Sequence, residues 1–297
     1  MKRFVRYQNG NYTVTIDTKD GTKIRENDLD FFRADFPESM DIKICNRCDM
    51  GCPMCHENST KDGAIGDIMS ESFIDKLHPY TELAIGGGNP LEHPDLVPFL
   101  EKCKSLKLIP SMTVNQFHFM NNQSFLKSLV DQHLIYGLGI SLTHVTEEFV
   151  EAAKEFPNAV IHVINGIVHP TQLESIANNG FKILILGYKE FRRGEVMYQH
   201  QSAAIEQLKQ MLYDRLPQMI EEGWFEVVSF DNLAIKQLDA ERLMSNEDWE
   251  QFYMGDDGSA TMYVDMVNRE FAKSSTSTER YPLENDIVTM FEKIRTN

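Results

Sequence analysis

Cysteine is scarce in this chain, which has five cysteines among 297 residues. Four of them lie between positions 45 and 55, and none follows Cys103. A disulfide framework distributes its cysteines along the chain to close long loops, and a reducing compartment does not preserve such bonds. The clustering therefore excludes a disulfide scaffold and indicates metal ligation.

Long apolar runs are also missing. No stretch approaches the roughly 18 apolar residues that a membrane span requires, and the N-terminal residues turn polar at once, unlike a signal peptide. We therefore expect a cytoplasmic protein without a membrane segment.

Positive charge is in short supply, with 29 Lys and Arg against 45 Asp and Glu and a net charge of −16. Binding to a nucleic-acid backbone or an anionic membrane needs clustered cations, so both are excluded as partners. A cationic or neutral substrate remains compatible, although acidic surfaces also serve solubility alone.

The 42% hydrophobic content is that of a globular protein with one large domain or two modest ones.

The first 35 residues predict a small β appendage. Tyr12–Ile16 and Thr22–Arg25 alternate between apolar and polar residues, and Lys19-Asp-Gly21 between them is a hairpin signal.

From residue 41 short apolar runs alternate with amphipathic helical segments. The predicted strands are Asp41–Cys45, Glu82–Ile85, Ile109–Val114, Tyr136–Leu142, Val160–Ile164 and Lys182–Leu186.

Helical spacing and capping residues complete the pattern. Ser70 and Thr146 occupy expected N-cap positions, and apolar spacing predicts a long helix near residues 201–222. Further strands are predicted at Trp224–Phe230 and Thr261–Asp265, and a last helix at Asp286–Ile294. Alternating strands and helices imply an α/β fold with parallel strands, whose active site lies at their carboxyl ends.

The cysteine run leaves the first of these strands and has the spacing C-x3-C-x2-C over Cys48, Cys52 and Cys55. Thiolates bind both zinc and iron-sulfur clusters, so the ligand type alone does not identify the metal. Zinc ribbons join two short-spaced pairs across a longer loop, and bacterial ferredoxins use a different order of spacings. Three ligands with one open iron fit this run better.

This cysteine spacing resembles the radical SAM signature, in which three cysteines hold a 4Fe-4S cluster and the fourth iron binds S-adenosylmethionine. A second match follows the second predicted strand: Gly86-Gly-Gly-Asn-Pro90 is similar to the family's glycine-rich segment that contacts the methionine amine. Asn89 stands where the family usually has Glu, so an amide oxygen replaces a carboxylate. Weaker matches at Thr113-Val-Asn115, Ser141 and Gly187–Gly194 come in the family's order.

The resemblance implies a partial (β/α)6 barrel that cleaves S-adenosylmethionine reductively and abstracts a hydrogen atom from a peptide, small molecule or nucleotide. It implies a reducing partner such as flavodoxin or ferredoxin, while the lack of later cysteines excludes auxiliary clusters.

We expect an appendage at residues 1–38, the barrel at residues 39–222 and an extension that closes the barrel at residues 223–297. The expected S-adenosylmethionine contacts are Met54, Gly87, Gly88, Asn89, Pro90, Asn115, Ser141, Tyr188 and Lys189.

The sequence assigns no catalytic residue, and several conspicuous side chains have ordinary explanations. Cys45 and Cys103 are expected to pack in the core, because a cysteine on an apolar strand or helix face behaves as a small apolar residue. His56 and His144 are more simply solvated or structural than catalytic. The alternative function from another class is a non-enzymatic iron-sulfur or zinc module, which has no use for the glycine segment at 86–90.

Two remaining pairs are interpreted by position. Lys189 and Arg193 lie where a carboxylate of S-adenosylmethionine or of the substrate would be clamped, and an ordinary surface role is equally compatible. Asp256 and Asp257 lack the other oxygen ligands of a calcium loop and are interpreted as a solvated turn.

Overall fold

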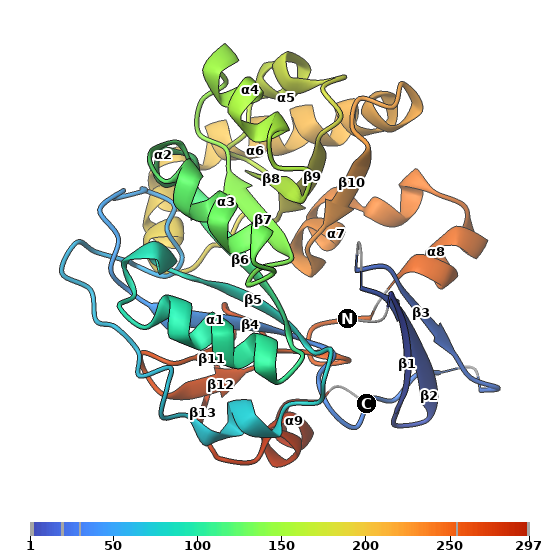
Figure 1. The fold of residues 1–297 in the computed structure, drawn as a ribbon. Coiled ribbons are helices and arrows are strands. Elements are labelled where there is room, and N and C mark those ends of the chain that lie inside the picture. The colour runs from blue at the N-terminus through green and yellow to red at the C-terminus, as the bar shows by residue number, and fades with distance from the viewer. Residues whose placement is uncertain (1–2, 19–20, 30, 254, 296–297) are drawn as a thin grey trace.

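Two sheets form the framework of the computed structural model, which describes residues 3–18, 21–29, 31–253 and 255–295 (Figure 1). The smaller sheet is antiparallel, with order β1-β2-β3. It consists of β1 (Phe4–Asn9), β2 (Tyr12–Asp17) and β3 (Lys23–Glu26). The two predicted stretches are β2 and β3, whereas Lys19 and Asp20 of the predicted turn lie outside the described residues.

The observed sheet therefore has one strand more than the predicted hairpin. Strand β1 escaped prediction because its alternating side chains are mostly exposed or half-buried, so it carries little apolar signal. The sheet is docked by its buried face: Tyr12 is 1% exposed, and Arg25 donates hydrogen bonds of 3.0 and 3.2 Å to Glu38, which precedes the main sheet.

The larger sheet has ten strands in the order β10-β9-β8-β7-β6-β5-β4-β11-β12-β13. Pairing is parallel from β10 through β11 and antiparallel from β11 to β13. The strands are β4 (Ser39–Cys45), β5 (Glu82–Gly87), β6 (Ile109–Asn115), β7 (Gly137–Ser141), β8 (Ala159–Ile164), β9 (Lys182–Leu186), β10 (Val227–Phe230), β11 (Thr261–Asp265), β12 (Glu270–Ala272) and β13 (Tyr281–Pro282).

All six predicted barrel strands are present, as β4 to β9, and so are the two later ones, as β10 and β11. The mixed α/β class with a large parallel sheet and a separate small antiparallel sheet is thus confirmed. The C-terminal strands join this sheet at both sides, because β10 pairs with β9 while β11 pairs with β4.

Helices connect the parallel strands. They are α1 (Leu96–Ser105), α2 (Gln116–Asn121), α3 (Gln123–Asp131), α4 (Glu147–Lys154), α5 (Pro170–Ile176), α6 (Arg193–Glu221), α7 (Asn232–Leu238), α8 (Asn246–Phe252) and α9 (Ile287–Ile294), with 3-10 turns at Ser72–Lys76, Pro90–Glu92 and Ala240–Leu243. No helix in this described part of the chain is long and apolar enough to cross a membrane.

The capping predictions have different outcomes. Thr146 accepts a hydrogen bond of 3.1 Å from the Phe149 amide and caps α4 as predicted. Ser70 was wrongly assigned, because its side chain bonds to Asp67 and the 3-10 turn after it begins at Ser72. Helix α6 begins at Arg193 rather than near 201, and Gln201 interrupts it with a φ of −133°. The predicted start corresponds to this kink.

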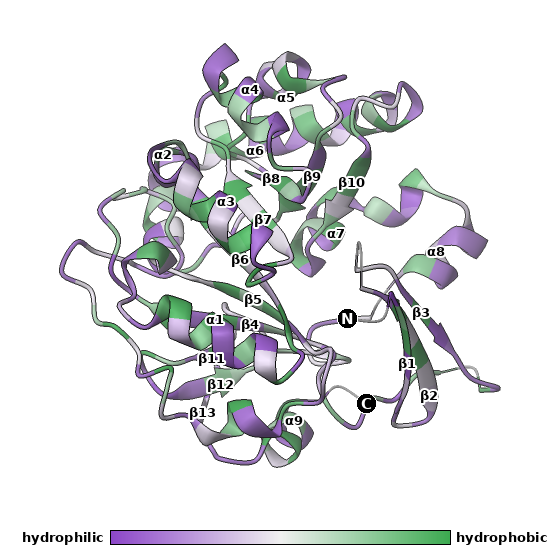
Figure 2. Cartoon of the chain, in the orientation of Figure 1, coloured by the Kyte–Doolittle hydropathy of each residue, from purple (hydrophilic) through white to green (hydrophobic). Residues whose placement is uncertain are grey.

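One face of the large sheet is covered by helices and forms the core. Central side chains on this face, such as Ile42, Ile85, Ile140 and Ile183, are at most 1% exposed. Figure 2 shows the apolar residues concentrated on these strands, while the helices also carry polar stripes. The opposite face carries the alternating polar residues and is called here the inner face.

The sheet curves strongly around its inner face. Lys189, just after β9, lies 3.0 Å from the hydroxyl of Ser275, which follows β12. Seven strand spacings separate β9 from β12 in the sheet order, and a flat sheet would hold them about 34 Å apart. Curvature thus brings the ends of β9 and β10 towards β4 and β11 across the inner face.

Candidate active site

The cysteine run lies in a loop that leaves the carboxyl end of β4 and folds back on itself. The Cys48 amide donates to the Thr60 carbonyl over 2.8 Å, and the Asn46 amide donates to the Ala64 carbonyl over 2.7 Å. Gly63 permits this close return, because a Cβ there would lie 1.9 Å from the Asn46 carbonyl oxygen. The loop is therefore anchored at both ends by backbone hydrogen bonds.

Cys48, Cys52 and Cys55 are free, half-buried thiols in this loop. Burial raises the pKa of Cys48, and the charges of Cys52 and Cys55 raise it further. Burial and the charge of Cys55 also raise the pKa of Cys52. The three thiols are thus close enough for their charges to act on one another, and a bound iron centre would relieve this repulsion.

The chemistry of the donor set is what bears on a metal. Among the residues that the structure describes, no group of three or more His, Cys, Asp or Glu side chains is arranged to hold a metal ion. Three thiols on one short loop are nevertheless the ligand type that a 4Fe-4S cluster takes. The donor set fits such a cluster.

The two remaining cysteines are core residues, as predicted. Cys45 and Cys103 are both 0% exposed, and burial raises their pKa values to about 11 and about 12 respectively. The Cys45 thiol also donates to the Asn89 carbonyl over 3.2 Å. Neither side chain is a ready thiolate ligand.

The glycine segment packs directly on the start of the cysteine loop. The Gly88 amide donates to the Cys45 carbonyl over 2.8 Å, and the Asn89 amide donates to the Arg47 carbonyl over 2.7 Å. A Cβ at Gly88 would lie 2.1 Å from the Arg47 carbonyl oxygen, and Gly87 has a φ of +110°. Only glycine satisfies both positions without displacing the loop.

Asn89 and Pro90 end this segment at the 3-10 turn Pro90–Glu92, and both are buried. The Asn89 amide oxygen accepts a hydrogen bond of 3.3 Å from the Leu91 amide, and its nitrogen donates to Glu92 over 3.2 Å. A carbonyl oxygen has a second lone pair, so this oxygen retains capacity for one more donor.

Two further predicted residues meet at the carboxyl ends of neighbouring strands. Asn115 on β6 pairs in register with Ser141 on β7. The Asn115 oxygen caps α2 by accepting from the Phe117 amide over 2.9 Å. Ser141 also pairs with His162 on β8, which had not been singled out from the sequence.

The segment after β9 reaches the cysteine loop. Lys189 contacts the His56 imidazole at 3.4 Å, and the buried Tyr188 donates its hydroxyl hydrogen to the Gly194 carbonyl over 2.8 Å. A Cβ at Gly194, the second residue of α6, would lie 3.4 Å from the Met54 carbonyl oxygen. Met54 and Lys189 are thus beside the three cysteines, while the Tyr188 side chain points towards α6.

A buried ionic network adjoins the cysteine loop and was missed from the sequence. Glu57 lies 2.9 Å from Lys43, 3.3 Å from Arg192 and 3.0 Å from the donating hydroxyl of Tyr263. Lys43 also pairs with Asp265 at 3.1 Å. The sequence did carry one indication of this network: Lys43 lies in the middle of the apolar strand Asp41–Cys45, and a buried cation requires partners.

Protonation within this network follows from the contacts. Burial opposes ionisation of Glu57, but its hydrogen bond with His56 and the charge of Lys43 outweigh burial and hold the pKa of the carboxyl well below its usual range. Burial, together with the nearby Lys189 charge, lowers the pKa of His56 to about 4. At neutral pH His56 is therefore an uncharged imidazole between Lys189 and Glu57.

The other conspicuous side chains lie as follows. His144 is exposed, and His93 is buried with its Nε2 2.9 Å from the Gly66 carbonyl oxygen. Arg193 donates to the Ser59 carbonyl over 2.7 Å, so it anchors the cysteine loop. Asp256 pairs with Lys236 at 2.8 Å on the surface.

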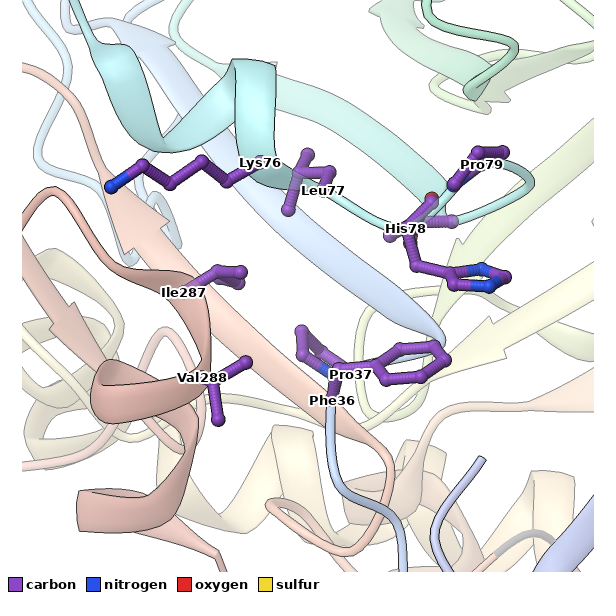
Figure 3. Close-up of a pocket in the computed structure, with 9 residues that line it drawn as sticks. Phe36, Pro37, Lys76, Leu77, His78, Pro79, Ile287 and Val288 are labelled. Atoms are coloured by element: carbon purple, nitrogen blue, oxygen red, sulfur yellow. Dashed lines mark hydrogen bonds between the residues drawn. The ribbon is translucent and has the colours of Figure 1, made fainter. Parts of the chain in front are cut away.

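A separate apolar pocket of about 290 Å³ lies at the other ends of the strands (Figure 3). Phe36 and His78 stack at 4.4 Å on one side of it, and Ile287 and Val288 of α9 form another wall. Its residues 36–37 and 76–79 precede β4 and β5. It therefore lies away from the cysteine loop, which leaves β4 at its carboxyl end.

Comparison with known proteins bears on the fold. No protein-family model and no curated protein matches the sequence. Crystal structures of Streptococcus suis SuiB do match. The structure bound to S-adenosylmethionine has a TM-score of 0.64 and 12% sequence identity, and the match covers 98% of this chain and 87% of that one. The structure bound to precursor peptide SuiA has a TM-score of 0.63 and 13% identity, and the match covers 97% of this chain and 87% of that one. The chain has the SuiB fold. The resemblance to radical SAM enzymes inferred from the sequence is confirmed at the level of the fold.

Proposed function

We propose that this protein is a radical SAM enzyme. The observation that carries the proposal is the direct packing of the glycine segment on the cysteine loop, through the hydrogen bonds from Gly88 to Cys45 and from Asn89 to Arg47. This contact brings the glycine backbone beside the loop that carries the three thiols, which supports a cluster with one open iron and a ligand bound next to it. A purely structural iron-sulfur or zinc module has no need of such a segment.

Cys48, Cys52 and Cys55 would hold a 4Fe-4S cluster. When bound, it would supply the electron that cleaves S-adenosylmethionine into methionine and a 5′-deoxyadenosyl radical, which takes a hydrogen atom from the substrate. The cysteine loop would keep water from the cluster, because backbone hydrogen bonds hold it against Thr60 and the start of α6. Glu57 and its cationic partners would fix the end of the loop that follows Cys55.

The S-adenosylmethionine site would span the carboxyl ends of β5 to β9. Gly87 and Gly88 allow the backbone to approach the ligand, and Asn89 offers its remaining lone pair to the methionine amine. Lys189 is suited to a carboxylate, because it has hydrogen-bonding neighbours in Ser275 and His56 but no carboxylate within ion-pair distance among the described residues. The remaining proposed contacts are Met54, Pro90, Asn115, Ser141 and Tyr188.

We assign residues 39–222 to a partial (β/α)6 barrel, residues 1–38 to an appendage and residues 223–297 to an extension that closes the barrel over the substrate. The pairing of β10 and β11 with the two sides of the barrel strands supports this division. So does the contact of Ser275, in the extension, with Lys189.

The substrate class is a peptide or a small molecule. SuiB is bound to a precursor peptide in one of the matching structures, which supports the peptide. We place the enzyme in the cytoplasm, where thiols stay reduced, with flavodoxin or ferredoxin as electron donor.

Anaerobic reconstitution with iron and sulfide, followed by reduction and assay for 5′-deoxyadenosine, tests the proposal. We expect deoxyadenosine to form from S-adenosylmethionine only when the cluster is present and reduced. A fully reconstituted cluster that yields none with any strong reductant would identify a non-enzymatic iron-sulfur module. Binding of a single zinc ion in place of iron would identify a zinc module.

A further inference from the structure

The inner face of the large sheet is accessible at its centre. Asp41 on β4 pairs in register with Ala84 on β5, which pairs with Ser111 on β6, and Ser111 pairs with Gly137 on β7. Asp41 lies deep within the protein, yet it and Ala84 are accessible to solvent from the inner side although their strands lie in the middle of the sheet. Three of these four residues are small, so the sheet has open space in front of it here.

Two glycines extend this space towards the carboxyl ends of the strands. A Cβ at Gly86 would meet no atom within 4 Å. A Cβ at Gly139 would lie 2.4 Å from Cε1 of His162, so the imidazole of His162 lies over Gly139. We call Asp41, Ala84, Gly86, Gly139 and His162 the inner-face site.

The side chain of His162 has no hydrogen bond or ion pair within the described ranges. Burial lowers its pKa to about 4, so the ring is neutral at physiological pH. The side chain is half-buried, and its Cε1 and Nε2 atoms lie over Gly139 beside the open space. Nε2 is therefore available to form a hydrogen bond with a ligand there.

Asp41 is the charged residue of this space and lies on β4, four strand spacings from β8. Its carboxylate has no hydrogen bond or ion pair among the described residues. Burial raises its pKa to about 6; Lys189 is the strongest charge that acts on it and lowers the pKa, whereas Asp231, Asp257 and Glu57 raise it. Glu57 is paired with Lys43 and Arg192. The other carboxylates, together with Asp41, outnumber the single cation Lys189, and this surplus favours a cationic ligand.

We propose that the inner-face site binds the substrate, and that Asp41 recognises a cationic group on it, a primary amine or a guanidinium, while His162 contacts the same molecule from β8. This inference rests on the proposed function and narrows its substrate. A phosphorylated nucleotide is disfavoured, because its anionic groups would meet the carboxylates of Asp41 and Asp231. A lysine or arginine side chain of a peptide and a free small amine share the required chemistry.

The test uses the reconstituted enzyme saturated with S-adenosylmethionine, so that the cofactor's own positive charge cannot occupy the site. Four probes are titrated by calorimetry or NMR: Nα-acetyl-lysine amide for the peptide source, agmatine for the free amine, Nα-acetyl-norleucine amide as the neutral analogue, and adenosine 5′-phosphate. We expect at least one cationic probe to bind about tenfold or more tightly than the neutral one. The stronger of the two cationic probes identifies the source.

Asp41→Asn should remove this preference for the cation, because the amide keeps the shape and loses the charge. His162→Gln should weaken charged and neutral probes alike. Asp131→Asn, on the exposed end of α3, is the matched control and should leave all affinities unchanged. Iron content and melting temperature establish that each variant is folded and loaded.

Any of four results would overturn the inference. The cationic and neutral probes could bind equally well, or Asp41→Asn could keep the preference for the cation. Adenosine 5′-phosphate could bind more tightly than the cationic probes, or neither cationic probe could bind in the millimolar range. None of these results touches the release of deoxyadenosine. Conversely, a failure to cleave S-adenosylmethionine would remove the proposed function while leaving a measured cation preference in place. The two failures are therefore distinguishable.

Discussion

Lys43 and Asp265 form a fully buried ion pair, with Nζ and Oδ2 3.1 Å apart, that joins the first strand of the large sheet to a strand near the C-terminus. Strands β4 and β11 place these residues directly opposite each other in register. Glu57 completes the arrangement at 2.9 Å from the same Nζ atom. One lysine thus connects the cysteine loop, the sheet and the C-terminal extension.

Glu57→Gln should strongly destabilise the protein. The substitution leaves Lys43, which is 2% exposed, with one carboxylate where water cannot compensate. It also removes the carboxylate partner of Arg192. Removing one member of a buried ionic network costs about 3–5 kcal/mol. Chemical denaturation of the cluster-free protein measures this loss in the free energy of unfolding.

The triple variant Lys43→Met, Glu57→Gln, Asp265→Asn is the matched control for that substitution. It removes the cation together with both of its carboxylates, so it should recover a substantial part of the lost stability. A Glu57→Gln variant within about 0.5 kcal/mol of the wild type, the range of an ordinary surface substitution, would show that the network does not hold the loop.

Single alanine substitutions separate the cluster ligands from the core cysteines. Cys48→Ala, Cys52→Ala and Cys55→Ala should each abolish assembly of the 4Fe-4S cluster, because each removes the thiolate of one iron. Iron content and the visible absorbance of the reconstituted protein measure this directly.

Cys45→Ala and Cys103→Ala are the companion variants and should retain the cluster, since both thiols are buried and their raised pKa values disfavour the thiolate. Loss of iron in Cys45→Ala would mean that the ligand set includes the first cysteine of the run.

Gly88→Ala should disturb the contact between the glycine segment and the cysteine loop. The added methyl group would lie 2.1 Å from the Arg47 carbonyl oxygen, which is backbone and cannot move independently. We expect a loss of about 1–3 kcal/mol in the free energy of unfolding, typical of overpacking, together with weaker S-adenosylmethionine binding.

Gly86→Ala, two residues earlier, is the stability control because its methyl group would meet no atom within 4 Å. Equal stability losses in the two variants would contradict the close packing at Gly88. Melting curves of the cluster-free proteins suffice for the comparison.

The sequence predicted the strands well because apolar runs bounded by turns leave a strong local signal. Lys182–Leu186 and Thr261–Asp265 were located to the residue. The cysteine loop and the glycine segment were also found, and the structure places them in contact. Strand β1 and the first turns of α6 were missed, since their side chains are largely exposed and carry little periodicity.

The partners of the polar inner-face residues could not be predicted. Alternation in Asp41–Cys45 indicates that Asp41 and Lys43 share a face, but nothing local shows that Lys43 is paired while Asp41 is not. Those contacts depend on Asp265 and Glu57, which reach β4 through the register of β11 and the return of the cysteine loop. Such long-range geometry comes only from the assembled sheet.

Asp41 provides a prediction about pH. Its pKa is raised from 3.8 to about 6, chiefly by burial. Between these two values the folded protein keeps a proton that the unfolded chain has released. Stability contributed by this carboxyl therefore falls as pH rises through the window and is lost above the folded pKa.

Asp41→Asn cannot titrate, so its free energy of unfolding relative to the wild type should increase between about pH 4 and about pH 7. We expect an increase of about 1 kcal/mol, less than the full pKa shift implies, because solvent reaches and screens this side chain. The nearby titrations of His56 and His162 occur in both proteins and cancel to first order in the difference. Urea denaturation of both proteins across this range is the measurement. A flat or decreasing difference would mean that the pKa of Asp41 is not raised by its burial and by the neighbouring carboxylates.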